Sequence, residues 1–108
     1  MSTFELFRDE NADLCFRLKT ASGKVILTSD GFASRAEVED GVSLAQKLAP
    51  DAKNYERKRT DDGHSFTLQT YDGEVVGTSE VYPTTAARDK GIEDVKDNAP
   101  EAEVIQAY

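Results

Sequence analysis

The sequence predicts an α+β fold made of two tandem copies of one unit, and three observations lead to this prediction. Shifting the 108-residue chain by 50 positions superimposes residues 16–32 on residues 66–82. Each copy first alternates apolar and polar residues and then changes to helical spacing. Each copy also ends its helical segment at an Ala-Pro dipeptide, at residues 49–50 and 99–100. Self-similarity at a fixed period indicates a repeated structural unit.

The two copies stay in register over most of their length. FRLKTASGKVILTSDGF in copy one matches FTLQTYDGEVVGTSEVY in copy two, and the register holds to the Ala-Pro dipeptides without a gap. Upstream, the segments align at an offset of 51, so the first hairpin loop of copy one carries one extra residue, a change that loops tolerate. We therefore expect one domain, residues 1–108, with repeat one at about residues 3–52 and repeat two at about residues 53–108.

The first part of each copy predicts three antiparallel strands. Leu14, Phe16 and Leu18 alternate with residues of the opposite face, and copy two alternates in the same way, which is typical of half-buried strands. The dipeptides Ser-Gly and Asp-Gly then place Gly23 and Gly73 where a tight turn requires positive φ. A third strand follows directly, so each repeat holds a strand triplet.

The second part of each copy predicts an amphipathic helix. Ser34 followed by Glu37 is a capping-box pattern, and Thr84 after Pro83 is a second helix start. Apolar residues then recur at steps of three and four and form one stripe per helix. The stripe residues are Val38, Val42, Ala45 and Ala49 in copy one and Ile92, Val95 and Ala99 in copy two. Arg88 stands at the position of Val38, so the second stripe is weaker.

A glycine lies beside the apolar stripe of each helix, at Gly41 and Gly91. Glycine inside a helix costs about 1 kcal/mol relative to alanine, so a compensating contact is expected at both places. We predict that another backbone approaches each glycine, either from the sheet beneath or from the other repeat's helix across a pseudo-twofold axis.

These segments resemble a known family of small bacterial and archaeal proteins, the DUF1508 or UPF0339 group, also called YegP-like. Its pattern has an aromatic-Glu start, a strand with F-x-L-K, a turn ending in glycine, and a helix close to N-G-I-E-S-V-K-K-N-A-P. Here FELF, FRLKTASGKVILTSDGF, GVSLAQKLAP and GIEDVKDNAP match it, and the two copies cover nearly the whole chain. The family often has an arginine directly before the F-x-L strand. This chain has Cys15 and Ser65 there, so any role of that arginine is absent or moved.

The resemblance implies a fold and no chemistry. In the family, β-β-β-α-β units join into one sheet, and the strand after each helix is exchanged between units. With both units in one chain, this implies a single, mainly antiparallel sheet packed against two helices. The sheet would be pseudo-twofold symmetric, with C-terminal strands exchanged between the repeats. The family has no established activity, so function has to be argued from the residues.

Composition disfavours several classes of partner. The chain has 21 acidic and 13 basic residues and a formal net charge of -8, which repels phosphate backbones and anionic membranes. No apolar run is long enough to span a bilayer, and the start MSTFELFRDE does not resemble a signal peptide. We therefore expect a cytoplasmic protein that binds neither nucleic acid nor membrane. The acidic excess would also suit a halophile; unfolding on transfer to low salt would support that hypothesis, and indifference to salt would remove it.

Few residues suggest catalysis or metal binding. His64 is the only histidine and Cys15 the only cysteine, too few for a usual zinc site of about four ligands. We interpret His64 as a hairpin-loop residue and Cys15 as a packing or surface residue rather than a reactive thiol. Asp61 and Asp62 precede a glycine without the spacing of a calcium-binding loop, which favours a turn. We predict no catalytic residue, no metal and no cofactor, and an enzymatic function would rest on nothing specific.

The one basic run is Arg57, Lys58 and Arg59. These side chains could hold an anion or an acidic partner, but charged residues also keep a sheet edge from pairing with other molecules. We favour solvated strand charges, or ion pairs with the surrounding acidic residues.

The best candidate surface is the repeated loop between the third strand and the helix. Its residues, Ser29, Asp30 and Phe32 in copy one and Ser79, Glu80 and Tyr82 in copy two, follow Thr28 and Thr78. Hydroxyls, a carboxylate and an aromatic ring near a helix start could form a small polar site, twice over. The same residues could instead cap a turn and fasten the loop to the core.

We therefore expect a small soluble interaction or structural module without catalysis. The alternative is a ligand-binding protein or enzyme with its site at the seam between the repeats. Matched apolar, glycine and hydroxyl positions favour the first interpretation, because catalysis usually needs unlike groups brought together. A protein partner is possible, and the chain is expected to be a monomer or a weak homodimer, since fusing two units internalises one contact while edge strands remain.

Overall fold

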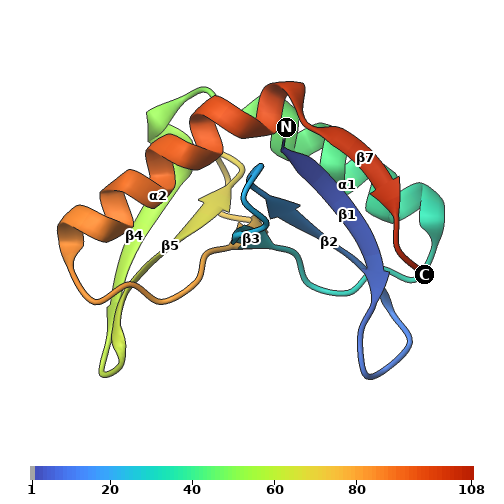
Figure 1. Cartoon of the computed structure of the whole chain (residues 1–108), viewed down its shortest axis with the longest axis horizontal. Helices are drawn as coiled ribbons and strands as arrows, with labels where there is room; N and C mark the ends of the chain where they lie inside the picture. Colours follow the sequence, from blue (N-terminus) through green and yellow to red (C-terminus); the bar gives the residue numbers. More distant parts are fainter. Residues whose placement is uncertain (1) are drawn as a thin grey trace.

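The computed structural model describes residues 2–108 and contains one curved, seven-stranded sheet with two α-helices along its outer side (Figure 1). The strands are β1 (Thr3–Arg8), β2 (Leu14–Lys19), β3 (Val25–Thr28), β4 (Tyr55–Thr60), β5 (Gly63–Gln69), β6 (Val75–Thr78) and β7 (Glu103–Gln106). The helices are α1 (Arg35–Leu48) and α2 (Thr85–Asn98), followed by the short 3-10 helices η1 (Ala52–Asn54) and η2 (Ala99–Glu101). The α+β class and the strand triplet of each repeat are confirmed.

The two repeats meet at the centre of the sheet. The strand order is β4-β5-β6-β3-β2-β1-β7, so the inner pair, β6 and β3, joins one repeat to the other. That pair is antiparallel and places Thr28 opposite Thr78. Every other pairing is also antiparallel except that of β7 with β1. The single, mainly antiparallel sheet with pseudo-twofold symmetry is therefore confirmed.

The strand after each helix joins the other repeat, as expected. The chain leaves α1, crosses the sheet and becomes β4 in repeat two, where Tyr55 opposes Leu68 of β5. It leaves α2, crosses in the opposite direction and becomes β7, which lies parallel to β1 with Thr3 opposite Glu103. The exchange is unequal, because β4 is itself the first strand of repeat two whereas β7 is an added seventh strand.

Both helices begin at the predicted caps. The Ser34 hydroxyl accepts a hydrogen bond from the Glu37 N–H at 3.2 Å, and the Thr84 hydroxyl accepts one from the Ala87 N–H at 3.0 Å. Such side chains satisfy N–H groups that the first turn leaves without a helical partner. Each helix also spans the seam, since α1 contacts β2 and β6 while α2 contacts β5 and β3.

The core lies between the helices and the sheet, and aromatic rings repeat within it. Phe4 and Phe16 meet edge to face at 5.5 Å between ring centroids, and Tyr55 and Phe66 do the same at 5.7 Å in repeat two. A third ring in each repeat, from the loop before the helix, stacks on this pair at 6.4 Å. All of these strand rings are buried. The same three-ring arrangement therefore fastens sheet, loop and helix together in both halves.

The glycines fall into two groups. Gly23 and Gly73 have φ of +87° and +90°, a conformation that side-chain-bearing residues rarely adopt. Gly41 and Gly91 instead make room for a neighbour, but that neighbour is not a backbone. A Cβ on Gly41 would lie 2.8 Å from the Phe32 ring, and one on Gly91 would lie 2.5 Å from the Tyr82 hydroxyl. The expected backbone approach was wrong, because the loop ring of the same repeat inserts between helix and sheet.

Candidate binding groove at the seam between the repeats

The two hydroxyls of the predicted loop surface are engaged by the backbone. The Ser29 hydroxyl accepts a hydrogen bond from the Phe16 N–H at 2.9 Å and donates one to the Asp30 carbonyl at 2.9 Å. The Ser79 hydroxyl accepts from the Phe66 N–H at 2.9 Å and donates to the carbonyl of the next residue at 2.7 Å. These hydroxyls therefore hold the loop to the neighbouring strand.

The two loops also lie apart. Because β3 and β6 run antiparallel at Thr28 and Thr78, the chain leaves their contact in opposite directions. Phe32 then forms a bridge with Leu14 in repeat one, and Tyr82 forms one with His64 in repeat two. The structure does not combine Ser29, Asp30 and Phe32 with Ser79, Glu80 and Tyr82 into one surface.

Asp30 and Phe32 instead meet the inner hairpin of repeat two. Together with Gly31, Gly41, Leu44, Glu74, Val75 and Val76, they line a hollow of about 410 Å³. One wall belongs to repeat one and the other to repeat two. This hollow therefore lies at the seam between the repeats.

The hollow continues along α1. A second hollow, of about 680 Å³, shares Leu44 and Glu74 with the first. Its other lining residues are Lys47, Leu48, Asp51, Lys53, Asn54, Thr70, Tyr71 and Asp72. We name the two hollows together the seam groove, which runs between α1 and the hairpin of β5 and β6.

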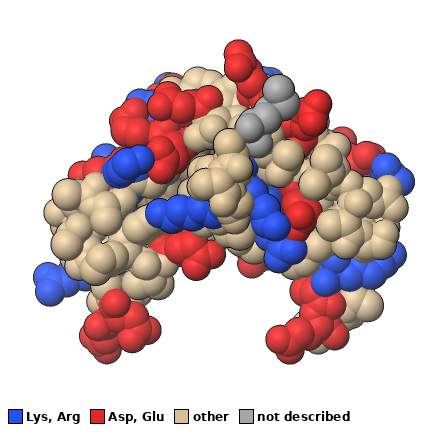
Figure 2. Space-filling model, in the orientation of Figure 1, with Lys and Arg blue, Asp and Glu red and all other residues tan. Residues whose placement is uncertain are grey.

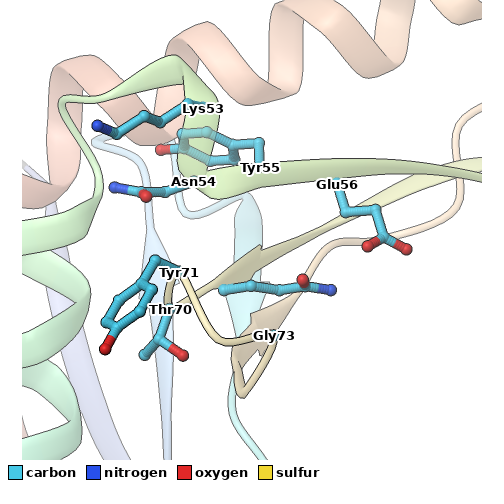
Figure 3. Close-up of a pocket in the computed structure, with 8 residues that line it drawn as sticks. Lys53, Asn54, Tyr55, Glu56, Thr70, Tyr71 and Gly73 are labelled. Atoms are coloured by element: carbon cyan, nitrogen blue, oxygen red, sulfur yellow. The ribbon is translucent and has the colours of Figure 1, made fainter.

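A smaller hollow opens from the far end of the seam groove, with a volume of about 240 Å³. Figure 3 shows Lys53 and Asn54 of η1 on one side and Thr70 and Tyr71 of the β5–β6 turn on the other. The Tyr71 side chain is 98% exposed, more than any other large apolar residue within residues 2–108. An aromatic ring so exposed at the mouth of a groove is available to a partner.

The corresponding region of the other half is organised differently. The ammonium group of Lys24 lies 5.4 Å from the centre of the Tyr82 ring, so a cation covers that ring. Glu74 occupies the equivalent turn position beside Phe32, and a carboxylate has no such attraction to a ring face. This exchange of Lys24 for Glu74 makes the two halves of the seam unlike.

The rim of the seam groove is more acidic than basic. Asp30, Asp51, Asp72 and Glu74 are opposed by Lys47 and Lys53. Lys53 is engaged with Asp51 at 3.5 Å. Acidic residues also cluster at the tips of the two outer hairpins, the lower points of the molecule in Figure 2. The rim of the groove by itself therefore carries more negative than positive charge, which attracts cationic groups.

The residues that could carry chemistry lie elsewhere and serve the fold. Burial raises the pKa of the Cys15 thiol to about 11, with the nearby Asp9 carboxylate contributing. The thiol donates to the Asp9 carboxylate at 3.6 Å, so it stays protonated and packs as a buried residue. His64 belongs to β5 and not to the hairpin turn, and its backbone pairs with Tyr82. Within residues 2–108, His64 Nδ1 and the Tyr82 hydroxyl are buried side-chain atoms without a hydrogen-bond partner.

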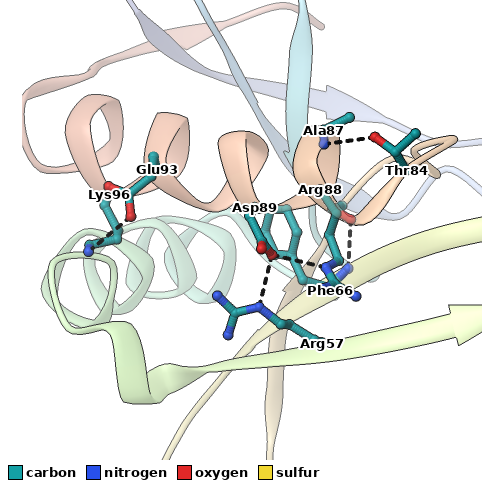
Figure 4. A network of polar contacts seen from close by, with 9 residues as sticks. Arg57, Phe66, Thr84, Ala87, Arg88, Asp89, Glu93 and Lys96 are labelled. Carbon is teal, nitrogen blue, oxygen red and sulfur yellow. Dashed lines mark hydrogen bonds and ion pairs between the residues drawn. The ribbon is translucent and has the colours of Figure 1, made fainter.

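Two residues of the basic run, Arg57 and Lys58, make ion pairs, which is one of the two outcomes expected from the sequence. Arg57 contacts Asp89 of α2 at 2.9 Å, and Arg88 contacts the same carboxylate at 3.2 Å (Figure 4). These guanidinium groups, Arg57 first, hold the pKa of Asp89 below its usual range. Lys58 pairs with Glu56 at 3.0 Å.

Two kinds of feature are absent from residues 2–108. No three His, Cys, Asp or Glu side chains in this part of the chain come together as metal ligands would. Neither helix described there has the length and apolarity needed to cross a lipid bilayer.

From the sequence, we placed the alternative site at the seam between the repeats and named Asp30 and Phe32 as candidate surface residues, but we did not identify the other residues that line the seam groove. The one available signal was the pair of β-turns, where repeat two has Tyr71 and Glu74 at the positions of Ala21 and Lys24. A difference between otherwise matched repeats indicates that one copy carries a property the other lacks. That these turn residues face α1 of the other repeat depends on the sheet order.

Comparison with known proteins agrees with this architecture. The family model for DUF1508, a domain of unknown function, matches residues 9–56 and 60–106. A UPF0339 protein in the ptx operon 5' region of Stutzerimonas stutzeri is 43% identical over 105 residues, which cover 96% of this chain and 95% of that protein. A UPF0339 protein of Bordetella pertussis is 40% identical over 103 residues, with 94% and 93% coverage.

Two solution NMR structures are similar to the whole fold. UPF0339 protein SO3888 from Shewanella oneidensis gives a TM-score of 0.89 at 30% identity, covering 97% of this chain and 90% of that one. YegP from E. coli, described as a protein of unknown function, gives 0.90 at 30% identity with 97% and 91% coverage. With both repeats matched and relatives aligned over nearly their full length, this chain belongs to the DUF1508 family of UPF0339 proteins.

Proposed function

We propose that this protein is a non-catalytic interaction module that holds a basic polypeptide segment with apolar anchors in the seam groove. The observation that carries the proposal is the groove itself, which has an apolar floor and an acidic rim and ends at the exposed ring of Tyr71. The groove exists only because both repeats lie in one sheet. The duplicated fold would thus serve to build one binding surface.

The floor supplies apolar surface that a partner could cover. Phe32, Leu44 and Leu48 are half-buried against the core, and Val75 remains 41% exposed. Covering apolar surface stabilises a complex by roughly 25 cal/mol per Å² before the costs of association. Tyr71 adds a ring that is apolar along its body and polar at its tip, a combination favoured at interfaces.

The charge around the groove favours a partner that carries positive charge. The rim carries four carboxylates and two lysines, on a chain whose net charge is -8. Such a field speeds encounter with cationic segments and suppresses binding of anionic ones. A segment with lysine or arginine flanking a leucine or aromatic residue matches both floor and rim.

The arrangement of polar groups supports binding over catalysis. The hydroxyls of Ser29 and Ser79 are bonded to backbone, and the Cys15 thiol keeps its proton. Nucleophilic catalysis needs such a group activated by an adjacent base. The rim residues are carboxylates and ammonium groups suited to complementary charge.

The test uses two synthetic peptides of the same length, one of lysine and leucine and one of glutamate and leucine, titrated by calorimetry. The lysine peptide should bind more tightly, and Tyr71→Ala should weaken it by about tenfold, which corresponds to about 1.4 kcal/mol. Asp72→Asn combined with Glu74→Gln should weaken it further at low salt. Val81→Ala is the matched control, because Val81 is 51% exposed but outside the groove.

Three results would count against the proposal: equal binding of the two peptides, no effect of Tyr71→Ala, or equal loss with Val81→Ala. The groove volumes of about 410 and 680 Å³ also fall within the range of small-molecule sites. A small molecule could raise the midpoint of thermal unfolding of the wild-type chain and not that of the Tyr71→Ala chain. That result would indicate that the groove binds this small molecule and not a polypeptide.

A further inference from the structure

We propose that β4 is a self-association edge, through which two copies of this chain pair antiparallel with Arg57 opposite Arg57. β4 is the first strand of the sheet order, so one of its sides faces no strand within residues 2–108 (Figure 1). A free edge presents N–H and C=O groups that can pair with another chain, and the charged side chains along it oppose such pairing unless opposite charges meet in register. The surface is distinct from the seam groove and stands independently of the proposed function.

The hydrogen-bond pattern shows which groups face outward. His64 exchanges both backbone hydrogen bonds with Tyr82, at 2.8 and 2.6 Å, so its N–H and C=O point away from β4. The backbone N–H and C=O of Phe66 likewise point toward the β6 side, where both bond to Ser79. Two residues that oppose each other in an antiparallel strand pair either exchange both backbone hydrogen bonds or both direct their N–H and C=O groups away from each other. Since Arg59 opposes His64 and Arg57 opposes Phe66, both arginines direct their N–H and C=O to the free edge.

Repeat one shows that the fold accepts a strand at this position. Leu6 opposes Phe16 in β1 as Arg57 opposes Phe66 in β4. The Leu6 carbonyl accepts a hydrogen bond from the Ala107 N–H at 2.7 Å, where β7 covers β1. No strand of residues 2–108 meets the equivalent carbonyl of Arg57. The first strands of the two repeats are thus equivalent in geometry, but a further strand covers β1 and none covers β4.

The side chains of β4 are complementary to themselves in the proposed register. With Arg57 opposite Arg57, Glu56 of each copy faces Lys58 of the other, and opposite charges directly across two strands are stabilising. Each Arg57 is held by Asp89 at 2.9 Å, which offsets the repulsion between the two guanidinium groups. Moving the centre by one residue would oppose Lys58 to Lys58 and Arg57 to Arg59. Charge therefore favours one antiparallel register and a closed, twofold dimer.

The net charge of -8 opposes this association at long range. Salt screens repulsion between exposed charges over distances beyond the Debye length. The short backbone hydrogen bonds of a strand pair are screened much less. We therefore expect a weak dimer at low salt that becomes tighter in high salt.

The first test is sedimentation equilibrium of the full chain over a wide concentration range at low and high NaCl. Arg59→Pro removes an outward N–H without touching the bonds to β5, a position where an edge strand accepts proline. It should weaken the dimer by about tenfold. Arg59→Ala is the matched control, because it removes the same charge and keeps the N–H, and it should dimerise like the wild type.

The second test fixes the register and does not depend on proline. Glu56→Lys and Lys58→Glu should each weaken the dimer, because each places like charges opposite one another. The variant that carries both substitutions should restore it, since the exchanged charges would again be opposite in sign across the two strands. Loss in each single variant and restoration in the double variant are expected if the two positions meet across the twofold axis.

Amide hydrogen exchange supplies a third measurement on the unmodified chain. The N–H groups of Arg57 and Arg59 should become protected as concentration rises, whereas that of Lys58, which faces β5, should be protected throughout. A chain that stays monomeric at every concentration and salt would overturn the proposal. A dimer that survives Arg59→Pro but is lost with Val104→Pro would also overturn it. The N–H of Val104 points away from β1, so that result would make β7 the associating edge. A dimer whose Arg57 and Arg59 amides exchange as fast as in the monomer would also overturn the proposal.

Discussion

The ring of Phe32 occupies the space into which a side chain on Gly41 would project. A Cβ on Gly41 would lie 2.8 Å from the ring's Cζ, closer than real Cβ atoms come to a neighbour. The ring is itself fixed, because it stacks on Phe16 with centroids 6.4 Å apart. The second repeat has the same contact, between Gly91 and the ring of Tyr82. The glycine in each helix is thus matched to a ring from the loop that precedes the helix.

This packing predicts that Gly41→Ala destabilises the protein. Alanine would improve helix propensity by about 1 kcal/mol, but forcing an extra carbon into a packed core typically costs about 1–3 kcal/mol. We expect a net loss of about 1 kcal/mol in the free energy of unfolding, measured by urea titration. Ser43→Ala, on the exposed side of the same helix, should cause no loss. An increase in stability with Gly41→Ala would show that the ring yields freely.

The backbone bond of Ser29 predicts a second loss. Ser29→Ala would leave the buried Phe16 N–H without its partner, and such a group costs about 1–3 kcal/mol. The residue is 7% exposed, so water does not readily replace the hydroxyl. Ser79→Ala should cost less, because Ser79 is only partly buried. Urea titration of both variants checks the order, and equal, negligible effects would contradict the structural role.

Glu5 predicts a pH dependence of stability. Hydrogen bonds and ion pairs, from Arg17 first and then Lys19, outweigh burial and lower the pKa of Glu5. A carboxyl with a lowered pKa in the folded state stabilises the protein above its unfolded pKa, near 4.5. That contribution is lost as pH falls through the lower, folded pKa. Glu5→Gln should therefore lower the thermal midpoint at pH 7 and flatten its decline in acid.

Glu56 provides the matched control, because it stands at the equivalent position of β4. Its side chain is 54% exposed, against 12% for Glu5, so solvent weakens its pairing with Lys58. Glu56→Gln should change the midpoint less at every pH. An effect as large as that of Glu5→Gln would mean that burial does not distinguish the two carboxylates.

Cys15 predicts slow thiol chemistry and a loss of stability in alkali. With its pKa raised to about 11, the folded thiol keeps its proton at pH 8 and should react with iodoacetamide at least about tenfold more slowly than in the urea-unfolded chain. The folded state also binds this proton more tightly than the unfolded state. Stability should therefore fall as pH rises above about 9. Cys15→Ala should show a shallower decline, and identical pH profiles would contradict the assignment.

Local patterns were sufficient for the elements and their order. Alternation at Phe16 and Phe66, the turn glycines Gly23 and Gly73, and the two helix caps concern residues close in the chain. Such patterns express backbone preference and the burial of one face, which neighbouring residues largely decide. Repetition strengthened each prediction, because two copies gave the same answer.

The placement of the loops could not be obtained in this way. Ser29 and Ser79 occupy equivalent positions in sequence, yet the antiparallel contact of Thr28 with Thr78 sends their loops in opposite directions. The partner of Gly41 was also wrongly predicted, because the depth of the ring beneath it depends on the spacing between helix and sheet. Neither the direction of the loops nor the depth of the ring is encoded in a local sequence pattern.

The sequence by itself determined that this protein is a duplicated α+β unit with strands, turns and helices at given residues, since those follow from local propensity and periodicity. Only the tertiary structure decided which strands join the two copies, that Phe32 and Leu44 share a groove with Tyr71 and Glu74, and that β4 stays open at the edge opposite the exchanged strand β7. The physical reason is that these relationships join residues far apart in the chain. They depend on the order and direction of strands in the sheet, which hydrogen bonding and packing fix for the molecule as a whole.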